Sequence, residues 1–410
     1  MPILTSLSPN TEPDDVRLAL RTLLRPPTWH DESTITNIEQ HLSRKFDSSA
    51  ILTSSGRSAL FHVLKTFNLS TSDEVIIQAL TCLAVPAAIQ WTGAKPVYVD
   101  INPNTYNIDP SQIANAITKN TKAIIVQHTF GIPGPIEELQ EIAKKHNLIL
   151  IEDLAHSFGS TYNNKLLGTF GDAAILSFGR DKVISSVFGG AVISSNKQII
   201  QKIKTAQQQL PFPPILWTIQ QLNHPILFSI IKPLYFVGQL GKALLVILQK
   251  TNLLSKAVEK KEKYNDKPGH LSYRFSPALA PLLSHQLSKI DRYNIRRREI
   301  AKTYLNALSD YAGLPQTIHQ TKPTWLRFPL IVNNPKKLHY QAKSKKTLLG
   351  DWYNSAIAPG DANPYLFNYK IGACPEAEKV SKHIINLPTY PTMTDAQVRQ
   401  VIQLIKSNDN

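Results

Sequence analysis

The stretch Leu148-Ile149-Leu150-Ile151-Glu152-Asp153 decides the fold class of this 410-residue chain. Its four consecutive apolar residues predict a strand buried on both faces, and Asp153 stands at the carboxyl end of that strand. The preceding stretch, residues 136–146, carries its apolar residues at helical spacing and predicts an amphipathic helix. A helix followed by a fully apolar strand is typical of a mostly parallel α/β sheet.

The same alternation of strand and helix runs through the first half of the chain. We expect strands at residues 50–53, 74–77, 95–99 and 123–126, and helices at 58–67, 85–91 and 109–117. Farther on, the pattern predicts a long connecting helix at 286–308, a strand at 325–332 and a closing helix at 394–405 that is capped by Thr392 or Thr394. We therefore expect a seven-stranded, mostly parallel sheet in a large domain (1–285) and a smaller C-terminal α+β domain (286–410).

Three motifs fall at strand ends, where ligands of parallel sheets bind. Ser55-Gly56-Arg57-Ser58 ends one strand and opens a helix, so its free amides suit a phosphate, which Arg57 either clamps or leaves to the amides. Asp153 ends a second strand. Lys182 follows a third, in Ser177-Phe178-Gly179-Arg180-Asp181-Lys182. The motifs are expected to converge on one crevice.

A lysine after a strand is usually a solvated surface residue, and an aspartate at a strand end often serves only as a helix cap. The order of Asp153, Ser177 and Lys182 favours another interpretation, a site for pyridoxal phosphate. The lysine amine forms a Schiff base, the serine hydroxyl takes a phosphate oxygen, and the aspartate pairs with the protonated pyridine nitrogen.

Further stretches can be matched piece by piece: Thr53-Ser54-Ser55-Gly56-Arg57, Gly93-Ala94-Lys95-Pro96, Gly168-Thr169-Phe170-Gly171-Asp172, Cys374-Pro375-Glu376-Ala377 and Leu387-Pro388-Thr389-Tyr390-Pro391. Over roughly residues 20–205 and 269–406, the sequence resembles the DegT/StrS family of nucleotide-sugar aminotransferases. The resemblance implies a fold-type I aminotransferase, a homodimer with sites shared across its interface, and pyridoxal 5'-phosphate as cofactor. It implies this set of cofactor-binding residues: Gly56, Arg57, Cys82, Asp153, His156, Ser177, Lys182 and Ser272.

The sequence departs from the family's pattern at two of these positions. Cys82 stands where members place an aromatic residue on the pyridine ring, so stacking there is lost or replaced by a sulfur contact. Ser272, or alternatively His270, stands in for the asparagine that reaches the neighbouring subunit's phosphate. His156 resembles the family's residue beside the cofactor's phenolic oxygen, although a hydrogen-bonded core histidine is the alternative.

The resemblance implies transamination of a keto-sugar nucleotide, with glutamate as amino donor, in cell-surface polysaccharide or glycan biosynthesis. Lys182 and Asp153 would be the catalytic pair. A sugar dehydratase is disfavoured, because the dehydratases that resemble this family replace the lysine with histidine. A silent regulatory or scaffold homologue stays open, because Cys82 and Ser272 depart from the pattern.

Composition favours a cytoplasmic enzyme. The net charge of +15 is local in part, since residues 201–268 hold ten lysines and three acids, and no motif interleaving basic and aromatic residues points to nucleic acid. The two cysteines give no disulfide framework, the histidines show no metal-ligand spacing, and the first residues lack the pattern of a signal peptide.

The interval at about 205–268 breaks the family's pattern as an insertion. Its apolar run at 225–248 is interrupted by Lys232, Pro233 and Lys242, so a membrane span is not expected. Two interpretations stay open. The insertion is either an extra helical pair packed on the dimer, or a basic amphipathic element that makes peripheral contact with anionic lipid at the inner membrane face, aided by Lys260, Lys261 and Lys263.

Overall fold

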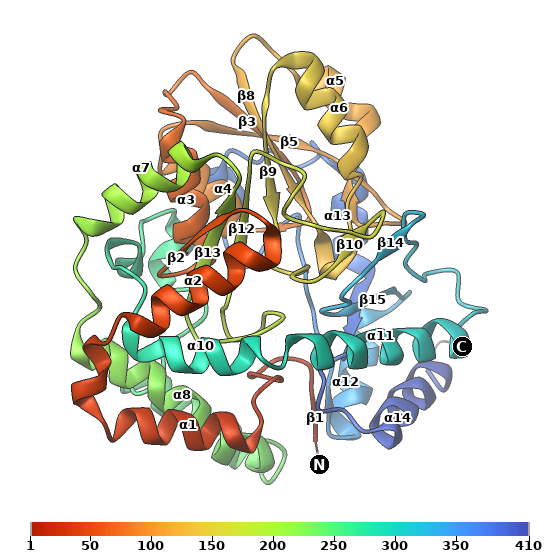
Figure 1. The fold of residues 1–410 in the computed structure, drawn as a ribbon. Helices are drawn as coiled ribbons and strands as arrows, with labels where there is room; N and C mark the ends of the chain where they lie inside the picture. Colours follow the sequence, from red (N-terminus) through yellow and green to blue (C-terminus); the bar gives the residue numbers. More distant parts are fainter. Residues whose placement is uncertain (1, 409–410) are drawn as a thin grey trace.

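The computed structural model describes residues 2–408, and its centre is a seven-stranded sheet (Figure 1). The strand order is β2-β13-β12-β9-β8-β3-β5. Neighbouring strands are parallel except that β13 runs antiparallel to both β12 and β2. The bounds are β2 Ser49–Thr53, β3 Glu74–Gln78, β5 Lys95–Val99, β8 Thr121–Gln127, β9 Ile149–Asp153, β12 Ala173–Ser177 and β13 Gly190–Ser194. The predicted α/β class with a mostly parallel sheet is confirmed.

Helices cover both faces of the sheet because successive strand residues point to opposite sides. On β3, Ile76 belongs to the core that holds α2 (Ser33–Phe46) and α6 (Ile136–His146). Its neighbours Val75 and Ile77 belong to the opposite core, under α3 (Gly56–Thr66), α4 (Ala84–Gln90) and α7 (Lys197–Gln208). The apolar runs that predicted buried strands therefore serve two cores at once.

Two predicted helices are not continuous in the structure. The expected helix at 109–117 is a 3₁₀ turn, Pro110–Gln112, followed by the single turn α5 (Ile113–Ala116), because the Asp109 side chain accepts from the Ser111 N–H and fixes a turn there. The expected connecting helix at 286–308 is two helices, α10 (Ala280–Leu287) and α11 (Ile290–Ala307), which break at residues 288–289.

The C-terminal part has its own core, built on β15 (Phe328–Ile331) paired antiparallel with β18 (Ile384–Leu387). It holds α12 (Pro335–Ser344), α13 (Pro375–His383) and α14 (Asp395–Lys406), and Thr394 caps α14 by accepting from the Gln397 N–H. At the start of the chain, β1 (Ile3–Leu4) pairs in parallel with β16 (Thr347–Leu348), so the first strand lies with this part. A domain division at residue 285 stays a prediction.

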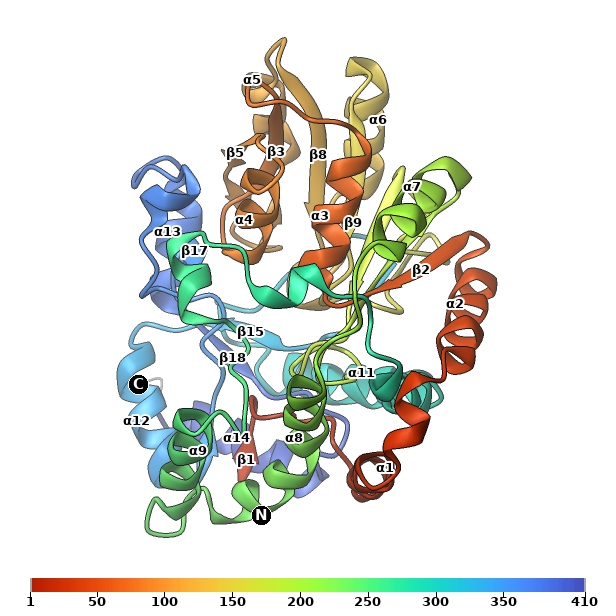
Figure 2. The same cartoon turned by 90° about the vertical axis from the view of Figure 1, so that its left-hand side faces the viewer.

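The insertion contains the helical pair α8 (Ile215–Leu234) and α9 (Leu240–Lys250). Figure 2 shows the pair at the end of the molecule opposite α5 and α6. A small core of Phe228, Ile231, Leu248 and Leu254 joins the two helices, and α8 packs along α1 (Pro13–Leu23). Within residues 2–408, no helix combines the length and apolar character needed to cross a bilayer.

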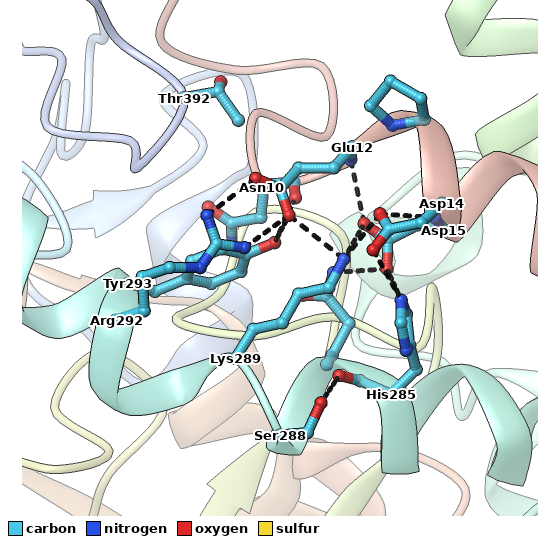
Figure 3. A network of polar contacts seen from close by, with 12 residues as sticks. Asn10, Glu12, Asp14, Asp15, His285, Ser288, Lys289, Arg292, Tyr293 and Thr392 are labelled. Atoms are coloured by element: carbon cyan, nitrogen blue, oxygen red, sulfur yellow. Dashed lines mark hydrogen bonds and ion pairs between the residues drawn. The ribbon is translucent and has the colours of Figure 1, made fainter.

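A polar network ties α1 to the α10–α11 junction (Figure 3). The Lys289 ammonium lies 2.7 Å from Asp14, 3.1 Å from Asp15 and 3.1 Å from Glu12. His285 Nε2 lies 3.0 Å from the Asp14 carboxylate. Asp14, Asp15 and His285 are close enough to share a cation, but the lysine ammonium already lies among these carboxylates. The break between α10 and α11 thus places a cation against three acids of α1 and its cap.

These contacts set the protonation of Asp14. Burial opposes ionisation, but hydrogen bonds from Lys289 and His285 outweigh it and lower the pKa of Asp14 to about 2. Since the folded pKa lies below the ordinary value of about 3.9, the stabilisation is present above that value and is lost as the pH falls through about 2.

We therefore expect Asp14→Asn to lower the free energy of unfolding at pH 7 by roughly 0.5–1 kcal/mol, the range of partly exposed ion pairs. The side chain is 45% exposed, which limits the effect. Urea titrations should show the deficit shrinking as the pH falls from 5 towards 2. Asp266→Asn, at an exposed carboxylate, serves as the control. A deficit of equal size at every pH would contradict the proposed charge network.

Candidate functional site

One cavity brings together seven of the eight candidate residues. It lies at the carboxyl ends of β2, β9 and β12, and it is lined by Gly56, Arg57, Cys82, Asp153, His156, Ser177 and Lys182. Parallel strands deliver these ends to one edge of the sheet, and the β12–β13 connection carries Lys182 across it. The structure thus assembles the site that the motifs predicted, while the role of each residue stays a prediction.

Lys182 and Asp153 offer an amine and a carboxylate to the cavity. The Lys182 ammonium makes no hydrogen bond to residues 2–408 and lies 5.1 Å from the centre of the Trp352 ring. Burial lowers the pKa of Lys182, and the nearby acidic groups Cys82 and Asp153 oppose the shift. A lowered pKa increases the neutral fraction of the amine, which is the nucleophilic form.

Asp153 has one oxygen held and one available. Its Oδ1 accepts the Ala155 N–H at 2.9 Å, while its other oxygen has no donor among residues 2–408. Burial raises the pKa of Asp153, and the Ala155 N–H and the Lys182 charge oppose the shift. A protonated ring nitrogen placed against the second oxygen would satisfy it and hold the carboxylate ionised.

The start of α3 forms a cradle for an anion. Ser55 caps the helix by accepting the Ser58 N–H at 3.1 Å, whereas the N–H groups of Gly56 and Arg57 have no acceptor within the described chain. A Cβ added to Gly56 would lie 2.7 Å from the Cβ of Ser177, so glycine alone lets the serine approach this closely. The free amides, the helix N-terminus and the Ser177 hydroxyl suit a phosphate group.

The Arg57 guanidinium is already engaged by two residues of the strip 255–262. It forms an ion pair with Glu262, whose side chain is fully buried, and it donates to the Ala257 carbonyl at 2.8 Å. Arg57 therefore does not point to solvent. Its expected role as a phosphate clamp stays a prediction, and a bound phosphate would share this guanidinium with Glu262.

A second arginine, Arg180, binds the same strip of the chain. Its guanidinium donates to the carbonyl and hydroxyl of Ser255 and, at 3.3 Å, to the Gln221 side chain. Ala257 and Val258 line the cavity between the two arginines. The strip 255–262 thus covers one side of the site. The sequence did not predict this cover, because neither arginine's partner lies within a recognisable motif.

His156 lies in the cavity wall with both ring nitrogens engaged. Its Nδ1 accepts the Phe130 N–H at 3.2 Å, and its Nε2 lies 3.2 Å from the hydroxyl of Tyr353. The Trp352 ring stacks on the imidazole, with ring centres 5.2 Å apart. His156 is a hydrogen-bonded buried histidine, as one expectation had it, and it also borders the cavity. Its role beside a cofactor stays a prediction.

Trp352 and Tyr353 are two further lining residues that sequence reasoning missed. They come from the C-terminal part, in the loop that precedes β17 (Ile357–Ala358), and β17 pairs with β4 (Thr81–Cys82). These two residues add aromatic surface to a cavity that Phe188 also lines, whereas position 82 contributes a sulfur. No motif marks the Gly350-Asp351-Trp352-Tyr353 stretch, so only its approach in space reveals it.

Ser272 is the candidate that the structure leaves apart. It is exposed at the end of a short 3₁₀ helix, Gly269–Ser272, and does not line the cavity of its own chain. The alternative, His270, is buried with its Nδ1 3.4 Å from Glu259. A contact between Ser272 and a cofactor would need a second subunit and stays a prediction.

Comparison with known proteins places this site in a family. The model of the DegT/DnrJ/EryC1/StrS aminotransferase family matches residues 12–210 and 244–406. The unmatched interval, 211–243, holds α8 and the start of α9, so the insertion is narrower than the expected 205–268, and the strip over the cavity falls within the matched part.

Individual relatives agree with the family match. An uncharacterized protein of Methanocaldococcus jannaschii is 32% identical over 93% of this chain and 89% of its own length. The dTDP-3-amino-3,6-dideoxy-alpha-D-galactopyranose transaminase of Aneurinibacillus thermoaerophilus is 28% identical over 85% of this chain and 83% of its own. The crystal structure of NtdA from Bacillus subtilis with bound cofactor PMP has the same fold, with a TM-score of 0.75 at 22% identity, covering 98% of this chain and 84% of NtdA.

The ion pair between Arg57 and Glu262 yields a stability prediction. Glu262→Ala should lower the free energy of unfolding of the cofactor-free protein by about 3 kcal/mol, because it leaves a largely buried guanidinium without its counter-charge. Asp361→Ala is the matched control. It removes the acid of an exposed pair with Lys263 and should cost under about 1 kcal/mol. Equal urea midpoints for the two variants would show that Glu262 is not a buried anchor.

Proposed function

Because the chain belongs to the DegT/DnrJ/EryC1/StrS aminotransferase family, we propose that it transfers an amino group from an amino acid to a keto-sugar nucleotide. The observation that carries the proposal is the unpaired Lys182 amine in one cavity with the half-satisfied Asp153 carboxylate. Similarity to a dTDP-amino-sugar transaminase supports a sugar nucleotide as acceptor. Glutamate is proposed as the donor, and the product as an amino sugar for polysaccharide or glycan synthesis.

The residues present fit pyridoxal 5'-phosphate. Lys182 would hold its aldehyde carbon, the free Asp153 oxygen its ring nitrogen, and the amides of Gly56 and Arg57 with Ser177 its phosphate. The B. subtilis relative binds the related cofactor PMP, which supports this assignment. When bound, the cofactor supplies an electron sink for the carbon that loses a proton.

The protein's own contribution is proton handling and shielding. With the cofactor bound, the Lys182 amine would accept and return a proton at its Nζ, and burial favours its neutral, basic form by lowering its pKa. Asp153 would keep the cofactor's ring nitrogen protonated. The strip 255–262 and the Trp352 ring cover the cavity and limit the access of water.

Lys182 also weighs against the alternatives. A dehydratase of the kind that resembles this family would carry histidine at this position, whereas Lys182 is present and its amine is free of hydrogen bonds to the described residues. A silent homologue has no need of an unpaired amine and carboxylate in one cavity. The structure gives no observation in favour of nucleic-acid binding.

Replacing the lysine tests the function directly. Lys182→Ala should abolish amino transfer and the borohydride-sensitive yellow colour of the cofactor-loaded protein, because no other side chain offers the cavity an amine. The urea midpoint should stay close to that of the wild type. Lys119→Ala, at an exposed lysine, should keep both colour and activity. Normal turnover by Lys182→Ala would overturn the assignment.

A homodimer is proposed with the enzyme, since the exposed Ser272 could then face the cavity of a second subunit. Sedimentation equilibrium measures the assembly state.

We propose peripheral contact with anionic lipid as a role for the α8–α9 surface, which comprises the exposed apolar residues Ile230, Val237, Leu240, Val246 and Ile247 together with Lys242 and Lys250. Apolar residues flanked by lysines suit the boundary of an anionic bilayer. Lys261 and Lys263 are less suited than expected, because they pair with Glu259 and Asp361. The charge for lipid would come from Lys242, Lys250 and the exposed Lys260.

Vesicle sedimentation distinguishes lipid contact from dimer packing. The protein should sediment with anionic vesicles at low salt and less with neutral ones. Lys242→Gln/Lys250→Gln should weaken binding by roughly 1 kcal/mol per lysine without changing activity on a soluble sugar nucleotide. Lys119→Gln is the matched control. If the wild type ignores anionic vesicles at low salt, membrane contact is excluded, and the apolar surface is then expected to pack in the dimer.

A further inference from the structure

A chain of hydrogen bonds with a fixed direction runs from Phe130 through His156 to Tyr353. The Phe130 backbone N–H can only donate, so His156 Nδ1 is the acceptor of that 3.2 Å bond. Burial lowers the pKa of His156 well below its ordinary value and so keeps the ring neutral. A neutral imidazole has one N–H, which must then be on Nε2.

The direction of the next bond follows. His156 Nε2 lies 3.2 Å from the Tyr353 hydroxyl and donates to its oxygen. Burial raises the pKa of Tyr353 well above its ordinary value, so the phenol keeps its hydrogen. A phenolic hydrogen prefers the plane of its ring. The hydroxyl hydrogen has two positions in the plane of the Tyr353 ring. Because the imidazole N–H faces one of them, the hydrogen occupies the other.

The Tyr353 hydrogen has no acceptor within residues 2–408, although the side chain is only 4% exposed. Tyr353 lines the same cavity as Lys182 and Asp153. A buried donor without an acceptor raises the free energy of the folded protein. The Tyr353 hydroxyl would gain an acceptor once an oxygen atom of a ligand enters the cavity.

The loop that carries Tyr353 is held in place by Asn386. The Asn386 side chain accepts the Trp352 N–H at 2.9 Å and donates to the Trp352 carbonyl at 2.7 Å. The backbones of Gly350 and Asn386 exchange two further bonds of 2.9 Å. On the ring side, the Arg327 guanidinium lies 3.6 Å from the centre of the Trp352 ring. The donor is thus positioned before any ligand binds.

We propose that Tyr353 donates a hydrogen bond to an oxygen of the bound cofactor or sugar substrate, and that His156 acts through Tyr353 rather than by touching the ligand. This inference rests on the proposed function. The shared chemistry is an oxygen acceptor, whose source is either the cofactor's phenolic oxygen or an oxygen of the sugar. Tyr353 is thus a ligand-contacting residue that the motifs did not reveal, and His156 is the positioning residue behind it.

The test is Tyr353→Phe, which removes the hydroxyl and keeps the ring. If the acceptor is the cofactor's phenolic oxygen, the pH at which the visible band of the loaded protein changes should rise by about one unit, because loss of the donor makes that oxygen more basic. If the acceptor belongs to the sugar, the band should titrate as in the wild type, and kcat/KM for the sugar nucleotide should fall about tenfold or more. Tyr106→Phe is the matched control, since this buried tyrosine packs on Phe130 outside the cavity.

A double variant tests the relay. The effect of His156→Gln should disappear in the Tyr353→Phe background if the histidine acts only through the tyrosine, whereas additive effects would mean that His156 touches the ligand itself. An unchanged band titration together with unchanged kinetics in Tyr353→Phe would overturn the proposal. Loss of the borohydride-sensitive band in the wild type would instead overturn the proposed function, so the two failures are distinguishable.

Discussion

The parallel register of β9 between β8 and β12 is the constraint on which the rest of the site depends. It sets Asp153 beside Gln127 on one side and Ile175 on the other, at the edge where the strands end. The antiparallel return of β13 then places Gly190 opposite Ser177, which holds the connection carrying Lys182 over the same edge. One residue of slip would turn every side chain of these strands to the opposite face. The placement of Asp153 and Lys182 at one edge of the sheet is therefore a consequence of sheet pairing.

The second constraint is long-range packing of the C-terminal part against this edge. β17 pairs with β4, and Asn386 fixes the backbone of Trp352. These contacts hold Trp352 and Tyr353 against the cavity at the edge of the large sheet. This packing bears on Cys82, which stands where the family places an aromatic residue. The position expected to supply an aromatic ring holds a sulfur, while two aromatic rings reach the cavity from the C-terminal part.

The strip 255–262, which follows the insertion along the chain, is bound to the site. A buried ion pair such as Arg57–Glu262 is rarely a strong source of net stability, because both charges lose water. It does fix where the strip 255–262 lies, since an unpaired charge at either end would be much more costly. The lysines of this region differ in their surroundings. Lys261 and Lys263 are paired with Glu259 and Asp361, whereas Lys242 and Lys250 are exposed on the α8–α9 surface.

The sequence by itself determined the α/β class, most strands and helices of the large sheet, and seven residues of the cavity, because periodicity and strand ends are local properties. It missed the break between α10 and α11, where Lys289 meets acids at the start of the chain. Only the tertiary structure decided the partners of Arg57 and His156, which lie 205 and 197 positions away along the chain. Such contacts depend on how separate elements pack, and no pattern within a single element specifies a partner at that distance.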